Sequence, residues 1–173
     1  MANPPVVSSE GLVRVDHHVF YLLERDSGGM NSPASFLNGL VDSEEGIVAI
    51  NTGIHSGSVR LRVEVCNTEP ALEPAGWEDI AEVSVSLDTD ILFICDSSMI
   101  SNPDFEFLEF EFSGEYRVRA HAQERDAAVD LVVHDGAERH LLQFWPSVSA
   151  DTVEHKISSR YGATRRRLAR ERS

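Results

Sequence analysis

Residues 58–66 read Ser-Val-Arg-Leu-Arg-Val-Glu-Val-Cys, and this stretch decides the fold class of the chain. Apolar side chains occupy every second position from Val59 to Val65, and charged side chains fill the positions between them. Because successive side chains of a strand point to opposite faces, the pattern predicts a strand with one buried face and one face toward water. Residues 116–121, Tyr-Arg-Val-Arg-Ala-His, repeat it. One-sided burial favours antiparallel sheets over parallel ones.

Short runs rich in Val, Ile, Phe and Tyr continue along most of the 173 residues, separated by turn-forming Gly, Asn, Asp and Pro. They predict strands at Leu12–Glu24, Gly46–Asn51, Ser58–Cys66, Asp79–Leu87, Ile91–Cys95, Phe105–Phe112, Tyr116–Ala122, Val129–His134 and Arg139–Phe144. This spacing, without a convincing helix between the runs, predicts an all-β fold: a mainly antiparallel β-sandwich of about eight or nine strands. At this length we expect one sandwich domain, over residues 11–150.

The strongest strand pattern is Phe-Glu-Phe-Leu-Glu-Phe-Glu-Phe at residues 105–112. Its alternation slips by one residue at positions 107–108, which indicates a β-bulge. The short Ser-Gly-Glu turn at residues 113–115 then predicts a hairpin with the strand that begins at Tyr116.

A second hairpin is predicted by Asp135-Gly136, which separates two further strand patterns. The alternation also selects the core side chains. We expect the core to include Phe20, Leu22, Val48, Ile50, Leu61, Val63, Val83, Val85, Leu92, Ile94, Phe105, Phe107, Phe110, Phe112, Val118, Leu131, Val133, Leu142 and Phe144.

The chain changes character at residues 151–154, where Asp-Thr-Val-Glu has the form of a helix N-cap with an acid three residues on. Four apolar side chains from this point onward lie roughly along one helical stripe: Val153, Ile157, Tyr161 and Leu168. We therefore expect residues 151–173 to form a basic C-terminal helix, or a tail that orders on contact. Its arginines allow three interpretations: the segment folds back on the acidic body of the protein, it keeps the terminus solvated, or it contacts nucleic acid.

The charge of the chain is unevenly distributed. The formal net charge is −14, but residues 1–155 hold eight arginines, no lysine and 28 acidic residues, which give this body a net charge of −20. Such a field repels nucleic acid and attracts basic partners by long-range steering.

An acidic ladder accompanies the strongest strand pattern and is a candidate partner-binding surface. If the Phe side chains are buried, the glutamates of that strand line one solvent face. The ladder would then imitate the phosphates of a nucleic acid before a basic nuclease groove. Alternatively, it is a solvated face that prevents edge-to-edge aggregation, or its acids pair with Arg117 and Arg119 on the next strand. Its members are Asp104, Glu106, Glu109, Glu111 and Glu115.

A second acidic cluster lies in a loop with Pro70, Pro74 and Gly76, and most of it is expected to be exposed. Trp77 in this loop either anchors the loop to the core or contacts a partner, since exposed Trp is enriched at binding hot spots. We include Trp77, Glu78 and Asp79 among the candidate partner-binding residues. The cluster consists of Glu69, Glu73, Glu78, Asp79 and Glu82.

Motifs for catalysis, nucleotide binding and metal binding are absent from the sequence. His17 and His18 would point to opposite faces of a strand, and the other histidines lack the spacing of zinc ligands. Cys66 and Cys95 are expected to be buried free thiols. We therefore expect no cofactor and no metal, and the sequence favours a non-catalytic protein over an enzyme. Without a signal-peptide pattern or an apolar membrane-spanning run, we expect a cytoplasmic protein.

Five segments carry a family resemblance: Val-Asp-His-His-Val-Phe-Tyr-Leu at 15–22, Thr-Gly-Ile-His-Ser-Gly at 52–57, Gly-Trp-Glu-Asp-Ile-Ala-Glu-Val-Ser at 76–84, Tyr-Arg-Val-Arg at 116–119, and Leu-Leu-Gln-Phe-Trp-Pro at 141–146. As a set they resemble a family of uncharacterised bacterial proteins common in actinobacteria. The order of parts is also similar to that of the ComJ-like competence proteins and nuclease inhibitors, including the Gly-x-Tyr-x-x strand at 114–118. That likeness implies an acidic protein that blocks a nuclease by occupying its active site.

The sequence thus predicts a non-catalytic acidic protein-binding module, an inhibitor or immunity protein for a basic partner such as a nuclease. The alternative is a small-molecule-binding or hydrolytic β-sandwich with a pocket at the strand ends near His55, Trp77 or His121. A third candidate is a structural subunit of a larger assembly, for which a large exposed apolar patch would be the sign.

Overall fold

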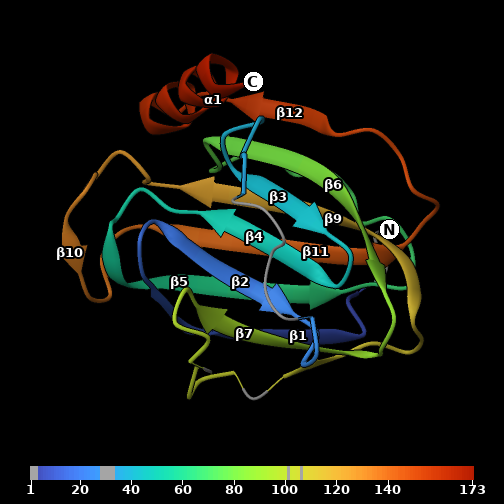
Figure 1. Ribbon diagram of the computed structural model, residues 1–173. Helices are drawn as coiled ribbons and strands as arrows, with labels where there is room; N and C mark the ends of the chain where they lie inside the picture. The colour runs from blue at the N-terminus through green and yellow to red at the C-terminus, as the bar shows by residue number, and fades with distance from the viewer. Residues whose placement is uncertain (1–3, 28–33, 101, 106) are drawn as a thin grey trace.

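Two β-sheets pack face to face in the computed structural model, which describes residues 4–27, 34–100, 102–105 and 107–173 (Figure 1). The larger sheet contains, in spatial order, β1 (Val7–Val15), β5 (Ser56–Val65), β11 (Arg139–Pro146), β9 (Gly114–Gln123), β6 (Asp79–Leu87) and β12 (Val153–Ile157), with β10 (Val132–Val133) also beside β5. The smaller sheet contains β3 (Val41–Glu44), β4 (Ile47–Asn51), β2 (Val19–Leu23), β7 (Ile91–Asp96) and β8 (Leu108–Glu109).

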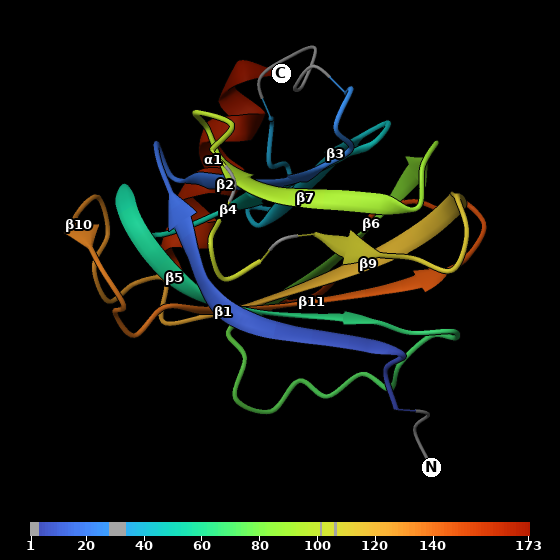
Figure 2. The ribbon, with the colours of Figure 1, turned by 90° about the horizontal axis from the view of Figure 1, so that it is seen from below.

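The predicted all-β sandwich is therefore confirmed. Among the described strands, most neighbours are antiparallel, as predicted, but β10 and β11 both run parallel to β5. The hairpin predicted at Asp135-Gly136 is therefore wrong, because the strands on either side of it follow one another along β5 instead of pairing with each other. Figure 2 shows the two layers from below, with the segment between β5 and β6 crossing the outer face of the larger sheet.

The core lies between the two layers and contains most of the predicted side chains. Phe110 and Phe144 meet there with ring centroids 5.4 Å apart. Three core predictions are wrong, since Phe107, Phe112 and Leu131 are 42, 49 and 57% exposed.

The strand predicted over residues 12–24 is in fact two strands that belong to different sheets. His17 and His18 adopt positive φ angles of 52° and 64°, so the chain turns there. Asp16 and Val19 close the turn through reciprocal backbone hydrogen bonds of 3.3 and 3.2 Å. The run of apolar residues on both sides of the turn conceals it in the sequence.

The long strand predicted over residues 105–112 is also wrong, because the structure describes only Leu108–Glu109 as a strand, at the edge of the smaller sheet against β7. Phe105 and Phe110 both enter the core, although they are five positions apart and a regular strand would point them to opposite faces. The predicted hairpin with the next strand does not form either, since β9 pairs with β6 and β11.

The C-terminal segment adds an edge strand and then a helix, α1 (Arg160–Arg172). The predicted N-cap at residues 151–154 is wrong: Val153 and Ile157 lie in β12, and the cap is Ser159, whose Oγ accepts a hydrogen bond from Gly162 N at 2.9 Å. The helix folds back on the protein, the first of the three interpretations of the tail. The described part of the chain contains no helix with the length and apolar character that crossing a membrane requires.

Arg125 joins the two sheets and α1 at a single buried point. Its Nη1 donates to Gly39 O at 2.7 Å and its Nη2 donates to Asp79 Oδ2 at 2.6 Å. The guanidinium also lies 5.4 Å from the ring centroid of Tyr161 in α1. A buried cation is stable only where carboxylates, carbonyls or ring faces surround it. Because Tyr161 supplies one of these contacts, Arg125 fixes the position of the C-terminal helix.

Candidate functional site

Exposed carboxylates gather at the end of the sandwich where β6 turns into β7. In the larger sheet Leu87 pairs with Gly114, and in the smaller sheet Ile91 pairs with Glu109. Both chain segments that carry the predicted glutamates therefore flank the turn at residues 88–90. We call this surface the acidic end, and it consists of Asp88, Asp90, Glu109, Glu111 and Glu115.

The carboxylates of the acidic end face solvent without neutralising partners. Within the part of the chain that the structure describes, Glu109, Glu111 and Glu115 form no ion pair. The predicted pairing of these acids with Arg117 and Arg119 is wrong, because both arginines are buried elsewhere. A concentrated negative surface therefore remains at this end of the molecule.

Phe112 places an aromatic ring among these carboxylates. Phe112 is 49% exposed, and its ring stacks on that of Tyr116 with centroids 6.2 Å apart and planes 30° apart. Tyr116 is buried, and its hydroxyl donates to the Phe112 carbonyl at 2.6 Å. The exposed ring is thus held by a fixed partner, which lowers the entropy that a binding partner would have to remove.

Two further members of the predicted ladder do not contribute to the acidic end. Asp104 accepts a hydrogen bond from Leu12 N at 2.9 Å, which places its carboxylate at the edge of β1. Glu106 lies outside the described residues. The ladder is therefore not a continuous row along one strand.

Glu78 and Asp79 lie at the start of β6, beside the start of α1. Asp79 is buried and accepts hydrogen bonds from Ser158 N at 2.9 Å and Ser159 N at 3.2 Å. Burial raises its pKa, but Arg125 and the serines outweigh this and hold the pKa below its ordinary value. Glu78 is half-buried and accepts from Glu124 N at 2.9 Å. Asp79 therefore holds the start of α1 through these hydrogen bonds, and its side chain is not exposed for contact with a partner protein.

Buried charges also occupy the outer face of the larger sheet. The alternation of β9 predicted that Arg117 and Arg119 face water, but the segment between β5 and β6 and the chain after β11 cover them. Glu82 accepts from Arg119 Nε at 2.7 Å, from Arg117 Nη2 at 3.2 Å, and contacts His155 Nε2 at 2.7 Å. Burial works against ionisation of Glu82, but these hydrogen bonds outweigh it and hold its pKa below the ordinary value. We call Glu82, Arg117 and Arg119 the buried ion cluster.

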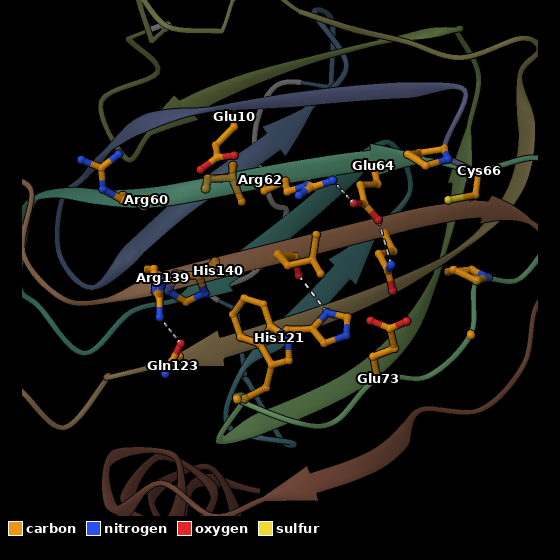
Figure 3. Close-up of a pocket in the computed structure, with 18 of the residues that line it drawn as sticks. Glu10, Arg60, Arg62, Glu64, Cys66, Glu73, His121, Gln123, Arg139 and His140 are labelled. Carbon is orange, nitrogen blue, oxygen red and sulfur yellow. Dashed lines mark hydrogen bonds and ion pairs between the residues drawn. The ribbon is translucent and has the colours of Figure 1, made fainter. Parts of the chain in front are cut away.

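A cleft of about 600 Å³ lies beside this cluster, between the sheet and the loop that joins β5 to β6 (Figure 3). Trp77 and His121 line it, as the small-molecule alternative expected, although it lies over the face of the sheet instead of at the strand ends. Other side chains that line it are Glu10, Arg60, Arg62, Glu64, Glu73, Gln123, Arg139, Leu141 and Gln143.

His121 is neutral in this cleft. Desolvation lowers its pKa to about 4, and its Nδ1 donates to Leu141 O at 3.1 Å. Trp77 packs against it with ring centroids 5.3 Å apart. Trp77 is half-buried, so one side anchors the loop while the other remains available.

Among the described residues, the histidine and cysteine side chains form neither a metal-binding cluster nor a disulfide. Among the residues that the structure describes, no group of three His, Cys, Asp or Glu side chains is placed to hold a metal ion. Cys66 and Cys95 are buried free thiols, and desolvation raises the pKa of Cys95 to about 11. A thiol with such a pKa is a poor nucleophile.

The sequence reasoning missed the outward position of Phe112 and the floor of the cleft. Phe112 has the same strand phase as the buried Phe110, so alternation alone could not separate them. The floor of the cleft comes from three strands that lie far apart in the sequence. Only the pairing of β5, β9 and β11 brings Arg62, Gln123 and Arg139 together.

Comparison with known proteins shows a similarity in fold alone. No family model and no curated protein matches this chain. A solved structure described as "Crocagin biosynthetic gene J" is similar over 82% of this chain and 98% of its own, with a TM-score of 0.56 and 17% identity. ComJ from Bacillus subtilis, described as an inhibitor of the DNA-degrading activity of NucA, is similar over 85% of this chain and 99% of its own, with a TM-score of 0.53 and 13% identity.

Proposed function

We propose that this protein is a non-catalytic binding module whose acidic end docks on a basic partner protein, as an inhibitor or immunity protein for a nuclease. The observation that carries the proposal is the concentration of unpaired carboxylates around the exposed ring of Phe112. Aromatic anchors contribute most of the binding energy at protein interfaces, while surrounding charges set partner choice and the association rate.

The distribution of cations supports the same role. The body of residues 1–155 has a net charge of −20, and three of its eight arginines, at positions 117, 119 and 125, are buried against carboxylates. Because these arginines are already paired, they do little to neutralise the acidic end. Such a field raises the association rate with a basic partner by 10-fold to roughly 1000-fold at low ionic strength.

The similarity in fold to ComJ supports a nuclease as the first partner to test, since ComJ is described as an inhibitor of a DNA-degrading activity. A basic nuclease groove is built to bind a row of phosphates, and the acidic end offers it carboxylates in their place. We place this role in the cytoplasm, where the two free thiols stay reduced.

The test uses purified basic nucleases and measures both DNA degradation and the association rate at low and high salt. The triple variant Glu109→Gln, Glu111→Gln, Glu115→Gln is expected to associate roughly tenfold more slowly and to lose most of its salt dependence. Phe112→Ala is expected to dissociate faster with little change in association rate.

A matched control changes three exposed acids elsewhere, through Glu124→Gln, Asp151→Asn and Glu154→Gln. The control alters the net charge equally, so it separates a local docking surface from a general charge effect. Equal slowing by both triple variants, or no inhibition of any nuclease in the panel, would overturn the proposal.

A further inference from the structure

The cleft over the larger sheet has one cationic end. Arg139 is exposed there, and its Nη2 donates to Gln123 Oε1 at 2.6 Å. Among the described residues Arg139 forms no ion pair, whereas Arg60 and Arg62 in the same cleft each contact a carboxylate oxygen at 2.8 Å. Arg139 is therefore the cation of the cleft that is free to bind an anionic group.

The opposite end of the cleft accepts hydrogen bonds. Gln143 is 8% exposed, and its Nε2 donates to Glu64 Oε2 at 2.9 Å, which fixes the orientation of the amide. Its Oε1 is then buried without a hydrogen-bond partner. The carboxylate of Glu73 lies at the same end of the cleft as Glu64, as Figure 3 shows. A buried acceptor without a donor is costly, so this end favours a ligand that carries an N–H group, above all a protonated amine.

The two ends are separated by an apolar and aromatic middle. Arg139, Leu141 and Gln143 occupy alternate positions of β11, so about 13 Å of strand separates the first from the last at roughly 3.3 Å per residue. Trp77 and neutral His121 lie along this stretch, and the one donor of His121 is already bonded to Leu141 O. The middle of the cleft thus offers ring faces and few polar groups, which suits a planar apolar ligand body.

From these three observations we propose that the cleft binds an elongated small zwitterion. Its carboxylate contacts Arg139, its planar body packs on Trp77, and its protonated amine donates to Gln143 Oε1 beside Glu73. The charges of the ligand thereby complement the two ends of the cleft in one orientation only. This site is separate from the acidic end, and its function does not depend on a nuclease partner.

The test compares three probes that share one benzene ring: para-aminomethylbenzoate, benzoate without the amine, and benzylamine without the carboxylate. Binding is followed by the NMR signals of the Trp77 indole N–H and the Gln143 side-chain amide. We expect the zwitterion to shift both signals and to bind about tenfold more tightly than either singly charged probe, because each charged hydrogen bond contributes separately.

The variants Arg139→Gln and Glu73→Gln both change exposed side chains, so they are expected to fold normally. Each should weaken binding of the zwitterion about tenfold and leave binding of one singly charged probe unchanged: benzylamine for Arg139→Gln and benzoate for Glu73→Gln. Glu109→Gln at the acidic end is the matched control and should have no effect. Equal affinity for all three probes, no shift of the Gln143 amide, or insensitivity to both variants would overturn the proposal.

Discussion

Replacing Glu82 by Gln tests whether the buried ion cluster holds the outer face of the larger sheet together. Glu82 is 6% exposed and is the carboxylate shared by Arg117 and Arg119. The substitution keeps the shape of the side chain and removes its charge. Both arginines then remain buried with one fewer negative charge between them, which is the unfavourable state that removal of one partner creates.

The size of the effect follows from the partners that remain. Breaking a buried pair costs about 3–5 kcal/mol. Arg117 keeps its hydrogen bonds to Ser84 Oγ and Ala150 O, both at 3.0 Å. Arg119 keeps Pro70 O and Glu69 at 2.9 Å. We therefore expect the low end of the range, about 3 kcal/mol, from a total stability of about 5–15 kcal/mol.

Urea denaturation measures this change. With a denaturant dependence of about 2 kcal/mol/M, the midpoint should fall by about 1.5 M. Adding Arg119→Met to Glu82→Gln should cost less than the sum of the single variants, because the two side chains share one interaction. The exposed Glu124→Gln serves as a control with little effect. A midpoint shift below about 0.3 M for Glu82→Gln, or strict additivity with Arg119→Met, would refute the reasoning.

Two further predictions concern His121 and the cap of α1. Because desolvation lowers the pKa of His121 from its ordinary value of 6.5 to about 4 in the folded state, the folded state resists protonation, and its stability should fall by about 3 kcal/mol as the pH drops from 6.5 to below 4. His121→Gln should remove this part of the pH dependence in thermal unfolding measured at pH 7 and pH 4.5, and an unchanged slope would contradict the assignment. Ser159→Ala removes the acceptor of Gly162 N and should cost about 1–2 kcal/mol in urea denaturation with some loss of helical circular dichroism, whereas a cost near zero would show that the cap is dispensable.

The sequence predicted the sandwich because the alternation of β5 and most of the core follow a simple rule. Val59 to Val65 face the core at every second residue, as their pattern requires. The rule failed at β9, where Arg117 and Arg119 have the same alternation but are covered by loops from outside the strand. Covering depends on tertiary packing, which the local pattern does not contain.

The sequence predicted that the glutamates of the acidic end are exposed, but it predicted this from a long regular strand that the structure does not contain. Glu109, Glu111 and Glu115 are exposed, as predicted, but the segment that carries the first two forms only the short strand Leu108–Glu109 and not the long strand that was predicted. Phe105 and Phe110 show the cause, since both reach the core from opposite phases of the alternation. Asp88 and Asp90 join the same surface only because β6 and β7 belong to different sheets and meet there.

The acidity of this chain has two physically different parts, and the same substitution separates them. Asp79 and Glu82 are neutralised inside the protein by buried arginines, so losing either charge should lower stability. Glu109 and its neighbours at the acidic end are exposed and unpaired, so losing them should leave stability within about 0.5 kcal/mol and slow association instead. Glutamate-to-glutamine changes at Glu82 and at Glu109 should therefore produce opposite readouts in unfolding and binding assays. If either variant altered both properties to a similar extent, the division between folding charges and docking charges would be wrong.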